Sequence, residues 1–95
     1  MTNDELNKKM TAFARTFPSM RNALGTDPWD AKELEAWSKS PLSHGERVTA
    51  WFLLSVSDPV VAWELDPFDL MEALRIWDPD HHKAFLRWAA DPWWP

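Results

Sequence analysis

One short stretch holds the residues best suited to chemistry, namely Asp78, Asp80, His81 and His82. A histidine beside carboxylates can bind a metal ion or act as an acid–base pair near neutral pH. The spacing argues against both roles, because adjacent residues on a helix lie about 100° apart, whereas metal ligands that share a helix face lie three or four residues apart. Asp78 is also placed to cap a helix, so its carboxylate is expected to be engaged there. We therefore interpret this stretch as a helix start with one solvated and one half-buried histidine; a metal-binding or catalytic site at His81 and His82 is the alternative.

Other sequence patterns of enzymes are missing. The chain has no cysteine, which excludes disulfides, thiolate metal sites and cysteine nucleophiles. It has neither a glycine-rich phosphate loop nor a Gly-x-Ser-x-Gly nucleophile elbow. His44 lies inside a Ser-x-x-Glu capping pattern formed by Ser43 and Glu46, where a histidine is typically a surface residue. We expect neither an enzyme nor a bound cofactor.

Five Asp-Pro pairs mark boundaries along the chain. Asp accepts a hydrogen bond from an unpaired N–H at a helix start, and Pro has the backbone angle of the first helical position. The pairs that begin at residues 27, 66 and 78 are followed by enough apolar residues for a helix, so we expect N-caps there. The pair at 58 fits a helix start or a turn. The pair at 91 has too few residues after it for a helix and should end one instead.

Apolar residues at helical spacing predict a single all-α domain that spans residues 1–95. A first stripe predicts a helix over 4–17, with one further turn over 19–24; it is formed by Leu6, Met10, Phe13 and Phe17. Further helices are expected over about 27–39, 43–57, 66–77 and 78–90. The segment 43–57 is apolar nearly all round, which predicts that it is central in a compact array or bundle of about five helices. The last two helices are almost contiguous and should meet at a corner or in a near-antiparallel hairpin.

The net charge of −5 is unevenly distributed. Residues 1–25 carry four basic and two acidic residues, whereas residues 26–95 carry six basic and thirteen acidic ones. An acidic chain binds nucleic acid poorly, because affinity for phosphate comes mainly from clustered Lys and Arg. The basic first helix nevertheless leaves a nucleic-acid-associated regulator as an alternative, with contacts from Lys8, Lys9, Arg15 and Arg21.

The location of the protein follows from what the sequence lacks. The first residues do not form the basic and apolar regions of a signal peptide. The longest apolar run is far shorter than the roughly 20 residues of a membrane span. We expect a cytoplasmic protein with no membrane contact.

Eight tryptophans and five phenylalanines supply material for a dense core. Four tryptophans fall on apolar helix stripes and are expected in the core, namely Trp37, Trp51, Trp77 and Trp88. Trp93 and Trp94 are adjacent in the tail, residues 91–95, where neighbouring side chains of an extended segment point to opposite sides. One of them should fold back on the core and the other should be exposed. The tail is either an intramolecular clasp or a binding element.

The C-terminal half also resembles a group of small, uncharacterised bacterial proteins. The resemblance begins at about Trp51 and ends in a Trp-Ala-Ala-x-Pro-Trp-Trp-Pro string. It is carried by Phe68-Asp69-Leu70, Glu72-Ala73-Leu74, Trp77-Asp78, His82, Ala84-Phe85-Leu86, Trp88-Ala89-Ala90 and Pro92-Trp93-Trp94-Pro95. No activity is established for these proteins, so the resemblance implies none for this chain.

Taken together, the sequence favours a non-enzymatic protein-protein interaction or regulatory module. Tryptophan is among the residues most enriched at the energetic centres of interfaces. The candidate contact residues are Trp93, Trp94, Trp63 and Trp29. The partner is expected to be a protein, and a second copy of the chain could occupy the same surface.

Overall fold

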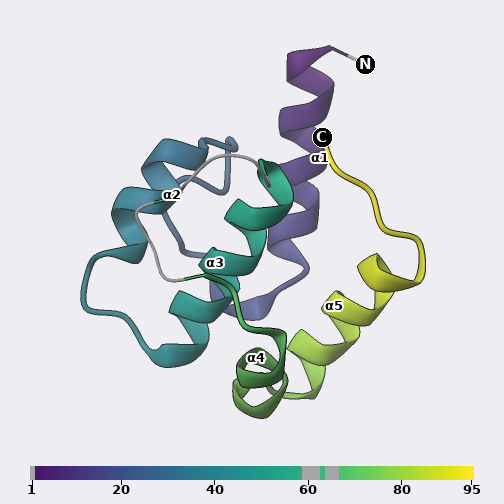
Figure 1. Cartoon of the computed structure of the whole chain (residues 1–95). Helices are drawn as coiled ribbons and strands as arrows, with labels where there is room; N and C mark the ends of the chain where they lie inside the picture. The colour runs from purple at the N-terminus through teal and green to yellow at the C-terminus, as the bar shows by residue number, and fades with distance from the viewer. Residues whose placement is uncertain (1, 59–62, 64–66) are drawn as a thin grey trace.

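Five α-helices surround an aromatic core in the computed structural model, which describes residues 2–58, 63 and 67–95 (Figure 1). The helices are α1 (Asn3–Arg15), α2 (Ala31–Ser38), α3 (His44–Ser57), α4 (Leu70–Ile76) and α5 (Pro79–Ala90), and a short 3₁₀ helix, η1 (Pro18–Met20), follows α1. The described ranges contain no strand, only an isolated bridge between Thr26 and Trp29. The prediction of an all-α array is therefore confirmed.

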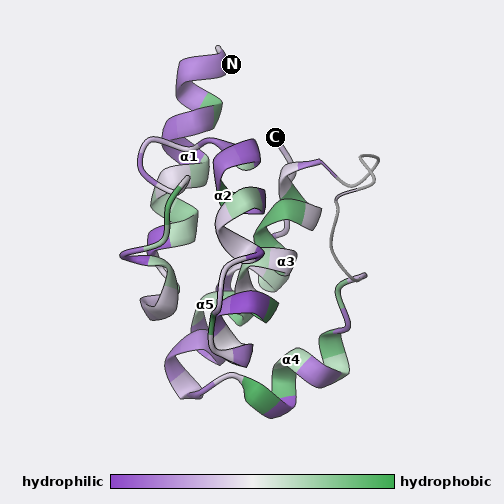
Figure 2. Ribbon diagram, turned by 90° about the vertical axis from the view of Figure 1, so that its left-hand side faces the viewer, coloured by the Kyte–Doolittle hydropathy of each residue, from purple (hydrophilic) through white to green (hydrophobic). Residues whose placement is uncertain are grey.

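Helix α3 is central, as its apolar sequence predicts. Its start is closed by the expected capping box, in which the Ser43 hydroxyl accepts from the Glu46 N–H at 3.2 Å and Glu46 accepts from the Ser43 N–H at 3.0 Å. The helix packs against α2, η1 and α4. Figure 2 shows hydrophobic residues along α3, whereas the first turns of α1 are hydrophilic and project beyond the other helices.

Two of the three predicted Asp-Pro caps are wrong. Helix α2 begins at Ala31, because Asp30 rather than Asp27 accepts the Glu33 N–H, at 3.2 Å. The Asp27–Pro28 peptide is cis and lies in the turn before the helix. The cap is thus provided by a second Asp, three residues downstream of the predicted one.

Helix α4 shows the same displacement of its start. It begins at Leu70 rather than at the 66–67 pair, because the Asp69 carboxylate accepts from the N–H groups of Met71 and Glu72. Asp66 itself lies outside the described residues, as does Pro59 of the pair at 58, so the choice between a helix start and a turn there is not tested.

The cap of α5 is confirmed. Asp78 accepts the His81 N–H at 2.9 Å, and Pro79 is the first helical residue. Only Trp77 and Asp78 separate α4 from α5, and the chain turns a corner there (Figure 1). The helix ends at Ala90, so the pair at 91 ends a helix as expected.

The first helix is shorter than predicted. Helix α1 ends at Arg15, and the further turn expected over 19–24 is reduced to η1. Gly25 then reverses the chain with a positive φ of 89°. A Cβ at this position would lie 2.4 Å from the Leu34 backbone nitrogen, so glycine is required for the close approach to α2.

Phe52 is the centre of the core. This α3 residue is buried, and its ring lies 5.2–6.0 Å, centroid to centroid, from six other aromatic rings. These rings come from the chain on both sides of α3, namely Phe13, Phe17, Phe68, Trp77, Phe85 and Trp88. The buried Trp77 N–H donates to the Thr49 hydroxyl at 2.8 Å, so the polar atom of this core tryptophan is satisfied.

Phe52→Ala should lower the free energy of unfolding by about 3–5 kcal/mol, because it removes the ring that all six others share. Urea unfolding followed by circular dichroism measures the change. Leu86→Ala is the matched control, since Leu86 is 59% exposed and its removal should change stability by less than about 0.5 kcal/mol. Similar losses in the two variants would contradict a core centred on Phe52.

Candidate functional site

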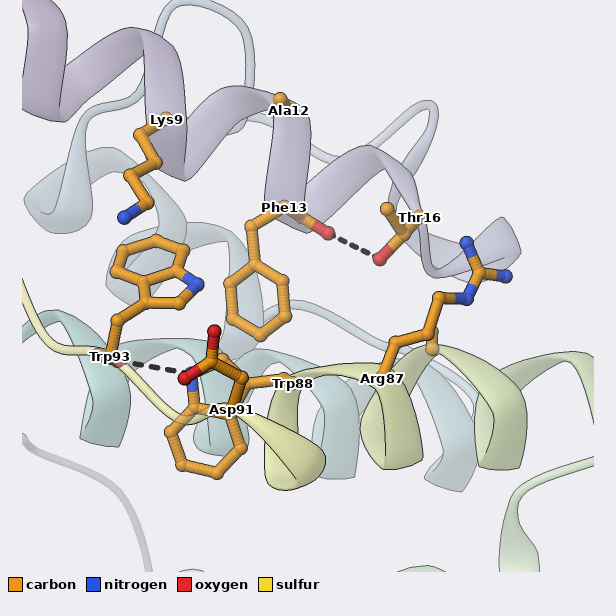
Figure 3. Close-up of a pocket in the computed structure, with 9 residues that line it drawn as sticks. Lys9, Ala12, Phe13, Thr16, Arg87, Trp88, Asp91 and Trp93 are labelled. Atoms are coloured by element: carbon orange, nitrogen blue, oxygen red, sulfur yellow. Dashed lines mark hydrogen bonds between the residues drawn. The ribbon is translucent and has the colours of Figure 1, made fainter.

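A cavity of about 380 Å³ opens between α1 and α5, and we call it the α1–α5 groove (Figure 3). It is lined by Lys9, Ala12, Phe13 and Thr16 of α1 and its cap, by Ala84, Arg87, Trp88 and Asp91 of α5 and its cap, and by Trp93 of the tail. On each helix the lining residues follow a spacing of three, one and three residues, which places them on one face. Two helix faces and the tail therefore form a single recess.

Trp93 of the tail forms one wall of the groove. The Trp93 ring packs edge-on against Phe13, with centroids 5.4 Å apart, and the Lys9 ammonium lies 4.1 Å from the Trp93 ring centroid. The Trp88 indole N–H donates to the Trp93 carbonyl oxygen at 3.0 Å. These contacts hold the tail against both helices.

Trp94 differs from its neighbour, as the sequence predicts. Trp93 is half-buried, whereas Trp94 is 54% exposed and touches the chain through an edge-on contact with Trp88, at 5.4 Å between centroids. One side chain thus anchors the tail, and the other offers an indole to solvent beside the groove.

Charged side chains stand at the rim of the groove. Figure 3 shows Lys9 and Arg87 on opposite sides of the cavity, with Phe13 between them. Lys9 is engaged with the Trp93 ring, while Arg87 makes no ion pair with any residue that the structure describes. Asp91 adds one carboxylate. The rim is therefore positively charged on balance.

The other two candidate tryptophans lie elsewhere. Trp29 is 8% exposed and forms part of the floor of a separate cavity of about 430 Å³ between α1 and the turn at 27–28. Trp63 is half-buried; its indole N–H donates to the Leu54 carbonyl at 3.0 Å, and the Lys32 ammonium lies 5.4 Å from its ring centroid. Of the four candidate tryptophans, only Trp93 and Trp94 therefore belong to the α1–α5 groove and its edge.

The basic residues proposed for nucleic-acid contact are dispersed. Arg15 forms an ion pair with Asp27 at 2.6 Å, and Lys9 lies over Trp93. Lys8 lines the separate cavity beside Trp29, and Arg21 is exposed after η1. Two of the four cations are thus already engaged within the chain.

His81 is buried, which corrects the expectation that one histidine of the pair is solvated. It is 7% exposed because the Asp78 cap turns its ring inward against Phe17 and Trp77. Its Nδ1 lies 2.7 Å from the Asp78 Oδ1, and its Nε2 lies 2.8 Å from the Ser19 hydroxyl. His82 is half-buried, and its Nε2 donates to the Leu74 carbonyl at 2.8 Å.

Ser19 is a site residue that the sequence analysis missed. It is 62 residues from His81, and no local pattern links the two. The alternative of a metal site at His81 and His82 would need further ligands beside them. Within the described ranges, no group of three His, Asp or Glu side chains is placed to hold a metal ion.

Comparisons with protein-family models, with curated proteins and with solved structures found no match for the chain. None of the helices in the described part of the chain is long and apolar enough to cross a bilayer.

The two tail tryptophans should respond differently to truncation. Trp93→Ala should lower the free energy of unfolding by about 1–3 kcal/mol, because it removes the packing on Phe13 and Lys9. Trp94→Ala should change it by less than about 0.5 kcal/mol, since its ring is largely in water. Chemical unfolding of both variants measures the difference; equal losses would show that Trp93 does not hold the tail.

The Asp78 cap should make stability depend on acid pH. Hydrogen bonds from the His81 N–H, and then from its ring, hold the pKa of the Asp78 carboxyl below its ordinary value of 3.8. A carboxyl with a lower pKa in the folded state stabilises the fold above its unfolded pKa, and this contribution is lost as the pH falls through the folded pKa.

Asp78→Asn keeps a capping side chain but cannot titrate, so its stability should fall less than that of the parent below about pH 4. Urea midpoints measured from neutral pH down to about pH 2 test this. Asp30→Asn, at a helix cap without a histidine, is the control; an identical acid response of the parent and the Asp78 variant would contradict the prediction.

Proposed function

We propose that this protein acts by binding a protein partner in the α1–α5 groove, and that the groove takes an apolar side chain with an acidic residue beside it. The observation that carries the proposal is an open aromatic recess with the Arg87 guanidinium at its rim, which makes no ion pair with a residue of the described ranges. Anchor side chains of protein partners are commonly held in well-packed pockets of an interface.

The interior of the groove favours an apolar or aromatic side chain. Phe13, Trp88 and Trp93 supply its walls, and the small Ala12 and Ala84 leave room between them. A volume of about 380 Å³ is at the lower end of the range of about 300–1,000 Å³ seen for ligand pockets, so it suits one large side chain. Rings in the walls can meet an incoming ring edge-on or offset.

The rim favours an acidic neighbour. Two cations, Lys9 and Arg87, flank the recess, against one carboxylate at Asp91. A guanidinium can bind a carboxylate through two parallel hydrogen bonds, which fixes the orientation of the partner as well as adding affinity. A basic segment would instead meet two like charges.

Trp94 supports the same surface from outside the groove. Its exposed ring stands next to Trp88, which lines the recess, so a partner seated there would cover it. Large aromatic residues at an interface contribute disproportionately to affinity. The tail then both completes the groove and offers a contact.

A random peptide library displayed on phage, selected on the full-length chain, tests the proposal. We expect enriched peptides with an aromatic or large aliphatic residue next to Asp or Glu. Arg87→Met should weaken a selected peptide by at least about tenfold, because it removes the carboxylate partner and keeps the apolar stem. Lys83→Met is the matched control, since Lys83 is an exposed cation of α5 outside the groove.

Three outcomes would contradict the proposal. The library shows no enrichment; or the enriched peptides bind the Arg87 and Lys83 variants equally; or sedimentation shows that the free chain is a dimer whose formation blocks peptide binding. The third outcome would identify a second copy as the occupant. Nucleic-acid binding remains the competing function, and salt-dependent binding that Arg87→Met leaves unchanged would favour it.

A further inference from the structure

A hydrogen-bonded chain of Asp78, His81 and Ser19 lies at the opposite end of the contact between α5 and the α1–η1 segment. At the groove, Phe13 packs on Trp88 of α5. Seven residues earlier on α5, His81 packs on Phe17 and forms a hydrogen bond with Ser19. The three side chains come from η1 and from the first turn of α5. Neither the groove nor its proposed ligand uses them.

The hydrogen bonds fix where the imidazole proton lies. The Ser19 backbone N–H can only donate, and it points at the His81 Nε2 from 3.3 Å. Nε2 must therefore accept, so the neutral ring carries its proton on Nδ1 and donates it to Asp78 at 2.7 Å. The Ser19 hydroxyl, 2.8 Å away, then donates to the same Nε2. This is the arrangement in which an imidazole can take a proton from a serine.

The surroundings hold this arrangement in place. His81 is packed between Phe17 and Trp77, with ring centroids 5.9 and 6.4 Å away, so its ring cannot turn freely. The Asp78 Oδ1 accepts both the His81 N–H and the ring, which ties the carboxylate to the helix start. The base is thus oriented by a third group, as nucleophilic catalysis requires.

Ser19 also borders a space that a small substrate could enter. A cavity of about 200 Å³ lies beside Ser19 and His81, and its other walls include Gly45, Ile76 and Trp77. Ser19 itself is half-buried rather than enclosed. The small volume suits a short acyl group.

We propose that Ser19 is a nucleophile that hydrolyses esters of short carboxylic acids, with His81 as the general base and Asp78 as its positioning residue. The Ser19 oxygen attacks the ester carbonyl carbon while its proton passes to the His81 Nε2. The C–O bond to the leaving alcohol breaks, and His81 returns the proton to that oxygen. Water then attacks the acyl-serine, gives a proton to His81 and releases the acid, and the proton returns to Ser19. The sum is ester plus water giving acid plus alcohol.

The test uses the full chain with p-nitrophenyl acetate as substrate and an alkyl fluorophosphonate as a serine-directed probe. We expect one phosphonate adduct per chain on Ser19, located by peptide mass spectrometry. Ser19→Ala should remove the adduct and lower acetate hydrolysis at least about 100-fold. Asp78→Asn should lower the rate about 10²- to 10⁴-fold with KM and melting temperature little changed, because the amide can donate to Nδ1 and so favour the tautomer with its proton on Nε2.

Two controls separate catalysis from background reactivity. His44→Gln removes an exposed histidine that does not line the cavity and contacts Glu72 instead, so it should leave the rate unchanged, whereas nonspecific imidazole hydrolysis would fall. Ser19→Ala is the second control: the parent should hydrolyse the acetate faster than this variant at every pH measured, because only the parent has the nucleophile. No adduct on Ser19 in the folded parent, or hydrolysis by Ser19→Ala at the parent rate, overturns the proposal. Neither result depends on what the groove binds.

Discussion

The packing of Phe52 against six aromatic rings is the interaction on which the structure depends. Its neighbours come from α1 and the residues just after it, from the residues before α4, from the α4–α5 corner and from α5, so a single side chain of α3 contacts most of the fold. A chain of 95 residues buries a limited core, and rings provide more buried area per residue than aliphatic side chains. The same rings then position both candidate sites, because Trp88 borders the groove and Trp77 packs on His81.

Both candidate sites lie along the contact between α5 and the α1–η1 segment, but their residues suit different chemistry. At one end, Phe13 and Trp88 form an open aromatic recess with cations at its rim. At the other end, Ser19 and His81 form a hydrogen-bonded pair beside a smaller cavity. Trp93 of the tail provides a wall of the groove, whereas the start of α3 lines the smaller cavity. An aromatic recess and a polar cluster thus lie within a few turns of the same helix.

Local signals in the sequence predicted the parts of the fold that depend on neighbouring residues. The Ser43–Glu46 capping box and the Asp78-Pro79 start of α5 each need only a few consecutive residues, and both are confirmed. The predicted starts at 27 and 66 failed because Asp30 and Asp69 offer the same capping carboxylate three residues later, and packing decides between equal local signals. The pairing of Ser19 with His81 depends on tertiary structure alone, so no pattern along the chain could indicate it.

The Asp78 cap has a consequence beyond starting a helix. It holds the first turn of α5 through the His81 N–H, and the His81 ring links that turn to Ser19 of η1. If α5 were rotated by the angle between adjacent residues, its side chains would turn by about 100°, and Arg87 and Trp88 would leave the groove while His81 left Ser19. The contacts of one carboxylate therefore help to hold both sets of residues in place. Complete loss of the cap would disturb two surfaces about 10 Å apart along the axis at once.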